Sequence, residues 1–240
     1  MYDLTKFNLS NMTECGVKLR NIGHGASNME EVANRIVKHF YENLINPENN
    51  QPACALIRFF KTHNYGDLPS ELQQVALELL GNQAPISTMK CLTLLGTVGQ
   101  EEPWNKRQDS MGHQVIPLVS PDVVAKAPMI SQLINQFGLE ISTVLDPDPQ
   151  LLLSLEKQTF NVFYIPDALG NRYIPAQETF IIPFNIKSVL GFGGILPSGN
   201  LFAIILFSQV KIPQNTADLF KTLALNVKLA ILPFAEKVFE

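Results

Sequence analysis

The chain has 240 residues, which is enough to form one large domain or two small ones with a buried core. Hydrophobic residues make up 46% of it and charged residues 17%, proportions that fit a globular protein. The formal net charge is −4 and the 18 basic residues are scattered, so the composition argues against a general nucleic-acid-binding protein or one that binds anionic membranes.

The amino-terminal residues do not form a basic segment followed by an apolar core, so the sequence predicts no signal peptide. The longest continuous apolar run, Leu201 to Phe207, is far shorter than the roughly 20 residues that span a bilayer, and we expect no membrane insertion. The three cysteines, Cys15, Cys54 and Cys91, are odd in number and widely spaced, which fits a reducing compartment better than a disulfide framework. We therefore expect a cytoplasmic protein.

Helical patterns dominate the amino-terminal part of the chain. A weaker pattern covers residues 11–23. The segment Ser27–Glu30 has the residues of a capping box, and apolar residues then recur at helical spacing from Met29 to Leu44. A further capped helix is expected to begin at Ser70 and to stop at Gly81.

Two buried strands are expected on either side of that last helix. Ala53–Lys61 and Met89–Gly99 are apolar on both faces, as in central strands of a sheet. After a polar stretch, Ser120 or Asp122 is expected to begin a helix that runs to Gly138. The segment "LDPDPQLLLSLEKQ" predicts a turn and a short helix, because its prolines fall at positions tolerated in a helix entry.

Short segments rich in β-forming residues fill the last third of the chain. They are "FNVFYIP", "TFIIPF", "IKSVLGFGGIL" and "NLFAIILFSQV", and Pro, Gly and Asn separate them. A helix follows from about Asn215, with no clear stop before Glu240. Consecutive strands in hairpin connection favour an α+β fold in which helices flank a central antiparallel β-sheet.

Three glycines, Gly191, Gly193 and Gly194, lie inside one of these apolar segments. A phosphate-binding fingerprint requires a helix directly after the glycines, with its amino terminus facing the phosphate. Here a turn at residues 197–200 and a second strand follow instead. We interpret the glycines as part of a hairpin strand, where they allow backbone or a ligand to approach the sheet closely.

The sequence offers no catalytic or metal-binding motif that we accept. Asp109, Ser110 and His113 have the residue types of a catalytic triad, but residues so close in sequence rarely converge, and no nucleophile elbow is present. The four histidines are isolated, and no Cys-x-x-Cys pair accompanies them, so we predict no metal site. Cys91 is expected to be a small core residue, and the cofactor, if any, is unknown.

The polar loop after the second strand is the best candidate for binding a ligand, because it is long and combines an aromatic ring with hydrogen-bond donors. A solvated loop whose tryptophan folds onto the core fits the same pattern. A weaker candidate of the same kind lies in "FYIPDALGNRYIPAQ". The candidate ligand-binding residues are Trp104, Asn105, Arg107, His113, Tyr164, Tyr173 and Gln177.

Several phrases of the chain resemble a GAF-type sensory domain, of the kind that forms the amino-terminal input segment of bacterial two-component histidine kinases. They are "ALIRFFKTHNYGDLP", "MKCLTLLGTVGQEEPWNKRQDSMGHQVIPL", "QTFNVFYIPDALGNRYIPAQETFIIPF" and "IKSVLGFGGILPSGNLFAIILFSQVKIPQNTADLFKTLALNVKLAILPF". The resemblance runs from about Ala53 to Phe234. It implies a GAF/PAS-like antiparallel sheet flanked by helices, terminal helices that pack together and form a homodimer, and a small ligand or a partner bound on one side of the sheet.

GAF-type domains have no universal ligand-binding motif, so the resemblance assigns no binding residue. The branch that binds cyclic nucleotides carries an Asn-Lys-x-Phe-Asp-Glu signature, from which Asn105-Lys106-Arg107 departs at once. The resemblance therefore does not support a cyclic nucleotide as the ligand.

We expect three parts along the chain: an amino-terminal helical region at 1–46, a GAF-like sensory domain at 47–234, and the start of a linker or signalling helix at 235–240. The expected function is non-catalytic signal sensing in signal transduction, by ligand binding, dimerisation or both. A downstream output domain, such as a kinase, would read the signal. The phosphoacceptor and nucleotide-binding boxes of a histidine kinase are absent from this sequence.

Two alternatives remain open at the level of sequence. One is a small-molecule enzyme on a GAF-like scaffold, such as a methionine sulfoxide reductase-like redox enzyme, in which Cys54 and Cys91 would be neighbours on adjacent strands. The other is a structural scaffold without a ligand, which a filled core lacking a cavity would favour.

Overall fold

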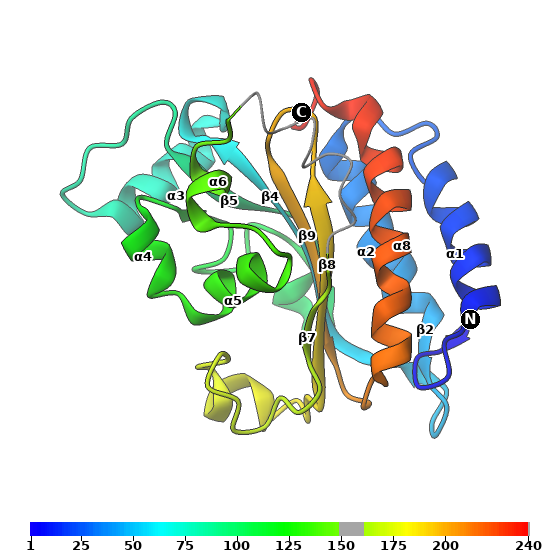
Figure 1. Cartoon of the computed structure of the whole chain (residues 1–240). Helices are drawn as coiled ribbons and strands as arrows, with labels where there is room; N and C mark the ends of the chain where they lie inside the picture. The colour runs from blue at the N-terminus through cyan, green and yellow to red at the C-terminus, as the bar shows by residue number, and fades with distance from the viewer. Residues whose placement is uncertain (149–160, 240) are drawn as a thin grey trace.

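A six-stranded antiparallel sheet forms the centre of the molecule (Figure 1). The computed structural model describes residues 1–148 and 161–239. The strand order is β6-β5-β4-β9-β8-β7, and every neighbouring pair is antiparallel. The strands are β4 (Cys54–Asn64), β5 (Lys90–Gly99), β6 (Val115–Pro117), β7 (Phe163–Ile165), β8 (Ser188–Ile195) and β9 (Leu201–Ser208). A small separate sheet joins β1 (Tyr2–Asp3), β2 (Leu44–Asn46) and β3 (Gln51–Pro52).

Three long helices cover one face of the central sheet. They are α1 (Leu9–Asn21), α2 (Met29–Asn43) and α8 (Gln214–Ile231). Helices α2 and α8 pack on the strands, and α1 packs along α8 (Figure 1). The predicted α+β fold with a helix-flanked antiparallel sheet is therefore confirmed.

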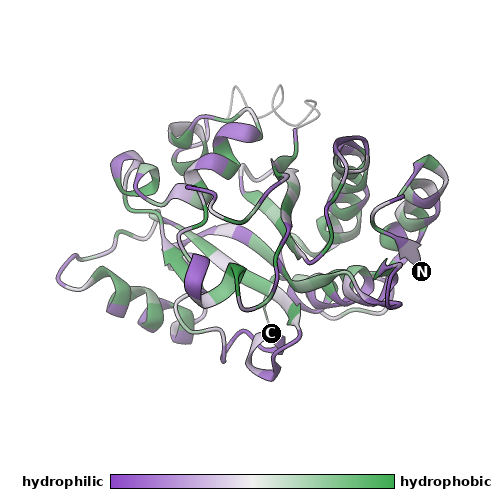
Figure 2. Ribbon diagram, turned by 90° about the horizontal axis from the view of Figure 1, so that it is seen from below, coloured by the Kyte–Doolittle hydropathy of each residue, from purple (hydrophilic) through white to green (hydrophobic). Residues whose placement is uncertain are grey.

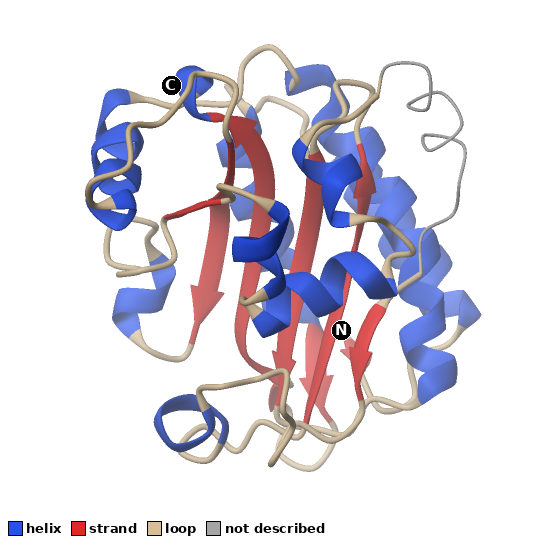
Figure 3. Cartoon of the chain, turned by 60° about the vertical axis from the view of Figure 1, so that its left-hand side comes forward, coloured by secondary structure: helices blue, strands red, loops and turns tan. Residues whose placement is uncertain are grey.

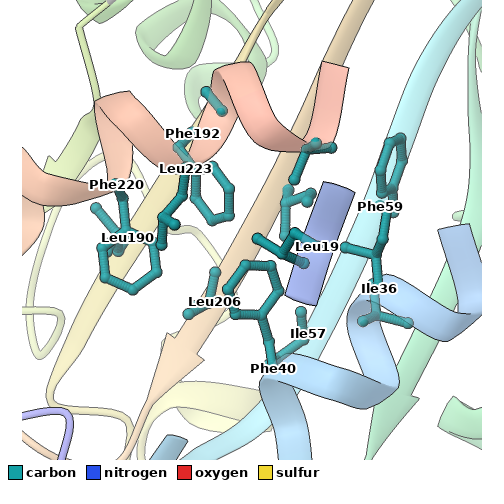
Figure 4. Packing of buried hydrophobic residues seen from close by; sticks show 14 of the residues in the cluster. Leu19, Ile36, Phe40, Ile57, Phe59, Leu190, Phe192, Leu206, Phe220 and Leu223 are labelled. Carbon is teal, nitrogen blue, oxygen red and sulfur yellow. The ribbon is translucent and has the colours of Figure 1, made fainter. Parts of the chain in front are cut away.

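The core beneath these helices combines aliphatic side chains with a group of aromatic rings (Figure 4). Phe40 of α2 and Phe192 of β8 meet edge to face with ring centroids 5.5 Å apart, and Phe220 of α8 lies 5.1 Å from Phe192. Such pairs add roughly 0.5–1.5 kcal/mol each beyond the area that they bury. The strands of the central sheet have mostly the hydrophobic colour, whereas the helices have both colours (Figure 2).

Glycine is required where main chains approach closely. A Cβ added to Gly96 of β5 would lie 2.8 Å from the Ala33 carbonyl carbon of α2, and one added to Gly193 of β8 would overlap the Phe202 carbonyl oxygen of β9. The glycine segment is thus the expected hairpin strand, because β8 pairs with β9 over its whole length.

Short helices and loops cover the opposite face of the sheet (Figure 3). They include α4 (Pro121–Ala125), α5 (Pro128–Gln136) and α6 (Ile141–Leu145), together with the 3-10 turn η2 (Glu102–Asn105) and the π-helical turn η3 (Gln177–Ile181). Helix α3 (Ser70–Leu80) packs beside β6 at the edge of the sheet, after the short turn η1 (Tyr65–Asp67). A last turn, η4 (Leu232–Phe234), follows α8.

The two predicted buried strands, the helix ending at Gly81 and the helix along residues 29–44 are confirmed. The cap of the latter is displaced by one residue from the prediction. Asn28 is the N-cap, and its Oδ1 accepts from the Glu31 amide at 2.8 Å. The Glu31 carboxylate in turn accepts from the Ser27 amide at 2.7 Å.

Three other sequence predictions about local structure are wrong. The helix expected from Ser120 to Gly138 is two helices, because Pro128 begins a new one. The segment "TFIIPF" is not a strand: its amides bond to preceding carbonyls, as the Ile182 amide does to the Gln177 carbonyl at 3.0 Å. The last helix does not run on toward residue 240, since α8 ends at Ile231 and Pro233 follows in η4.

The chain turns back after η4. The Met29 and Glu30 amides donate to the carbonyls of Lys237 and Val238, so the segment after α8 pairs with the start of α2. The short helix expected after residue 148 lies outside the described residues.

Candidate functional site

A cavity of about 570 Å³ lies against the sheet face that α2 and α8 leave uncovered. Its floor is formed by side chains of β4, β5 and β9, and its roof by α5, α6, η3 and the loop after β5. Volumes of about 300–1,000 Å³ with mainly apolar walls are typical of small-molecule sites. The alternative of a filled scaffold without a cavity is thus not what the structure shows.

The cavity exists because β4 divides its side chains between the two faces. Ile57 and Phe59 point into the helix-covered core, whereas Leu56, Arg58 and Phe60 line the cavity. Successive side chains of a strand point to opposite faces, so the register of β4 places the charged side chain of Arg58 on the cavity side.

Arg58 is the unusual member of the cavity wall. The residue is only 7% exposed, and its Nε, which is fully buried, has no hydrogen-bond partner in the part of the chain that the structure describes. Among the described residues no carboxylate forms an ion pair with it. Burial lowers the pKa of its guanidinium to about 10, which still leaves it protonated at neutral pH. The cavity therefore contains a positive charge that no described residue compensates.

Two of the predicted ligand-binding residues, Trp104 and His113, also line the cavity. The indole of Trp104 packs against Phe184, with ring centroids 4.5 Å apart, and against Phe180 at 5.6 Å. Trp104 is held by its main chain, because its carbonyl accepts from the Thr97 hydroxyl at 2.7 Å.

The imidazole of His113 lies at an exposed part of the cavity wall. Its Nδ1 is 3.0 Å from the Met111 carbonyl oxygen, and a carbonyl can only accept, so Nδ1 carries the proton and Nε2 is free to accept. Partial removal of water lowers the pKa of His113, and the charge of Arg58 lowers it further. His113 is thus a neutral hydrogen-bonding group at pH 7.

Asn105 and Arg107 lie outside this cavity. The Asn105 side chain bonds both the amide and the carbonyl of Gly99, so it fixes the loop after β5. Arg107 pairs with Glu30 at 2.6 Å and lines a second, smaller cavity of about 180 Å³ that also includes Asn105. Its charge, unlike that of Arg58, has a counterion within the protein.

The three remaining candidates have structural contacts. The Tyr164 hydroxyl donates to the Ile212 carbonyl, and Tyr173 packs against the core on the cavity side beneath the guanidinium of Arg172. The Gln177 amide nitrogen donates to carbonyls of its own loop, including that of Ile174 at 2.9 Å, and thereby holds η3 in place. None of the three is part of the cavity wall as described.

Sequence reasoning missed Arg58, although a trace of it was visible. It is the one charged residue in the interior of "ACALIRFFK", a segment expected to be apolar on both faces. A charge inside a buried strand requires a partner, and the sequence cannot show whether the protein supplies one.

The cysteines are arranged unfavourably for redox chemistry. All three are buried, and burial raises the pKa of each thiol, to about 12 for Cys15 and Cys91. Cys91 pairs with His63, at the end of β4 opposite to Cys54. That separation is about 30 Å along the strand, so Cys54 and Cys91 lie on adjacent strands but are not neighbours, as the redox alternative would require.

The residues of the apparent triad are not assembled for catalysis. Ser110 donates its hydroxyl proton to the Lys106 carbonyl at 3.0 Å, while His113 bonds to Met111. Within residues 1–148 and 161–239 no group of three or more His, Cys, Asp or Glu side chains is placed to hold a metal ion. Nor does this part of the chain contain a helix that is both long and apolar enough to cross a membrane.

No protein-family model matches the chain, and no curated protein shows significant similarity to it.

Proposed function

We propose that this protein is a non-catalytic, GAF-type sensory module that binds a small molecule in the cavity next to Arg58. The observation that carries the proposal is a largely apolar cavity of about 570 Å³ with one buried cation that no described residue neutralises. Such a cation is unfavourable in an empty cavity, so its presence is best explained by a bound partner.

The sheet offers a physical route from the cavity to the helices. The side chains of β4 alternate between the two faces of the sheet. A ligand in contact with Arg58 and Phe60 therefore lies against one face of this strand. On the opposite face, Ile57 and Phe59 pack in the core that contains α2 and α8. A ligand that binds more tightly to one packing arrangement of these helices would increase the population of that arrangement. An output domain such as a histidine kinase would respond to the change in helix packing.

The proposal includes a homodimer formed through the terminal helices. α1 packs along α8, and exposed apolar side chains remain on both helices: Leu9, Val17, Leu225 and Leu229. Leu225 and Leu229 are one helical turn apart on α8 and thus share a face. An association through this surface would place the helices of two copies side by side.

Ligand binding is tested by measuring thermal unfolding of the wild-type protein in the presence of pooled metabolites. We expect at least one pool to raise the melting temperature, and the variant Ala203→Trp, which fills the cavity from β9, to lose that response. Leu229→Trp adds the same side chain outside the cavity and is the matched control. If no pool stabilises the folded wild-type protein, or if Ala203→Trp responds unchanged, the sensory proposal is wrong.

Dimerisation is tested separately by native mass spectrometry. The wild-type chain is expected to be dimeric and the double variant Leu225→Glu/Leu229→Glu to be monomeric, while Leu79→Glu on exposed α3 remains dimeric. A wild-type protein that is monomeric at micromolar concentration would contradict this part of the proposal.

A further inference from the structure

We infer that the ligand of this cavity is an amphipathic monoanion, a carboxylate on an apolar body, and that Arg58 binds the carboxylate. The inference rests on the proposed function, because it specifies the chemical class of the molecule that the cavity binds.

The anionic group follows from the isolated charge. Arg58 lies on the floor in the middle of the sheet, where β4 pairs with Thr97 of β5 and Ile205 of β9. The described residues that line the cavity include no aspartate or glutamate. A largely buried guanidinium whose Nε has no acceptor among the described residues is destabilising, whereas its fork of donors matches a carboxylate.

The single charge follows from how few other polar groups are available. Thr62 also lines the cavity, but its hydroxyl accepts from the Leu201 amide at 2.9 Å and donates its proton to the Asn200 side-chain oxygen at 3.4 Å. His113 is neutral and offers an acceptor at Nε2. Among the described lining residues the Thr179 hydroxyl and the Trp104 indole N–H are further donors, but both are neutral. With Arg58 as the one cation in the described wall, the cavity neutralises one negative charge and does not match the double charge of a phosphate dianion.

The apolar body follows from the remainder of the wall. Leu92 and Ile205 from the sheet, Leu133 and Ile134 from α5, and Phe180 from η3 surround the space. Contact between these side chains and a hydrocarbon or an aromatic ring removes apolar surface from water, which is favourable. A sugar or a peptide backbone in the same place would have no hydrogen-bond partners among them.

The chain contains a built-in reporter of occupancy. Trp104 is its only tryptophan and its indole lines the cavity, so its fluorescence changes when a ligand displaces water from the wall. The probes are two matched pairs, octanoate with octanamide and naphthylacetate with naphthylacetamide. Within each pair the shape is retained and only the charge differs.

We expect at least one acid to bind the wild-type protein about ten-fold or more tightly than its amide. Arg58→Gln should weaken binding of that acid by roughly thirty-fold or more and leave binding of the amide unchanged. Arg58→Lys should restore part of the preference, because it returns the charge without the planar fork. Arg20→Gln, on the opposite side of the sheet, is the matched control and should bind like wild type.

The outcomes separate this inference from the proposed function. Equal binding of acid and amide, or a preference that survives in folded Arg58→Gln, overturns the inference and leaves a ligand-binding cavity in place. So does a case in which neither pair binds but a metabolite of another class does. If no compound changes Trp104 fluorescence or the melting temperature, the inference and the proposed function both fail.

Discussion

The two faces of the central sheet follow different packing rules. On the helix-covered face, rings such as Phe40, Phe192 and Phe220 interlock, and Lys61 of β4 is buried on the same side. On the other face, side chains of β4, β5 and β9 border a cavity, and Arg58 is buried there without a counterion among the described residues. The first face is a packed core, whereas the second has open space next to a buried charge, as binding sites do.

The sharpest test of this difference uses two adjacent phenylalanines of β4. Phe59 is fully buried in the packed face and stacks on Phe202, whereas Phe60 borders the cavity. Phe59→Ala should lower the free energy of unfolding by about 4 kcal/mol, because it creates a new void. Phe60→Ala should lower it by about 2 kcal/mol, since it only enlarges an existing one. If urea denaturation shows that both variants lose the same free energy of unfolding, the two faces of the sheet do not differ in packing as described.

Lys61 is a second buried cation, on the same side of β4 as Phe59. Its titration should give the next largest change in the free energy of unfolding. Burial lowers the pKa of its amine from 10.5 to about 8, and the positive charge of Lys90 contributes. The unfolded chain therefore binds this proton more tightly than the folded one. The free energy of unfolding should rise as the pH increases from about 8 toward 10.5, by a total on the order of 3 kcal/mol.

In Lys61→Met the free energy of unfolding at pH 7 should exceed that of the wild type, and the rise above pH 8 should disappear. Urea denaturation at several pH values measures both quantities. A wild-type stability that falls steadily over that range would mean that the amine is charged and stabilised in the folded state.

Removing the charge from the cavity should stabilise the empty protein. Arg58→Met keeps an unbranched apolar side chain and removes a guanidinium without a described partner, so the free energy of unfolding should rise by about 2 kcal/mol. Arg20 is exposed and donates to Asn226, so Arg20→Met should not raise the free energy of unfolding. A loss of stability in Arg58→Met would show that the arginine has a stabilising partner in the folded protein.

The smallest expected effect concerns the cap of α2, the helix that covers the packed face. Asn28→Ala should cost about 1 kcal/mol, because the Glu31 amide loses its acceptor. Ser27→Ala is the matched control and should cost less than Asn28→Ala, since Ser27 contributes mainly its amide to the Glu31 carboxylate, and the substitution keeps that amide. If thermal denaturation shows a larger loss of stability for Ser27→Ala than for Asn28→Ala, Ser27 is the N-cap, as the sequence predicts.

Patterning along the chain predicts the sheet-and-helix architecture well. The strands around Phe59 and Cys91 are visible because long apolar runs bounded by turn residues have few other solutions. The glycines of β8 were interpretable because a turn and a strand follow them. Local hydrogen bonding is harder to predict: "TFIIPF" has β-forming residues, yet it folds into a π-helical turn that Gln177 fixes through contacts within its own loop.

The site was predictable only in part, for a physical reason. Trp104 and His113 stand out as an aromatic ring and a hydrogen-bonding group in one polar loop, and both line the cavity. Asn105 and Gln177 look identical in sequence to binding residues, but they bond their own loops. The role of Arg58 depends on its having no counterion among the described residues, which is a property of the fold rather than of any segment of sequence.

The most direct test of the central claim is a crystal structure of the protein with naphthylacetate. We predict that the naphthyl ring occupies the apolar part of the cavity and that the carboxylate accepts hydrogen bonds from the Arg58 guanidinium at about 2.8 Å. A ligand bound elsewhere on the protein, or a carboxylate that turns away from Arg58 within the cavity, would contradict it.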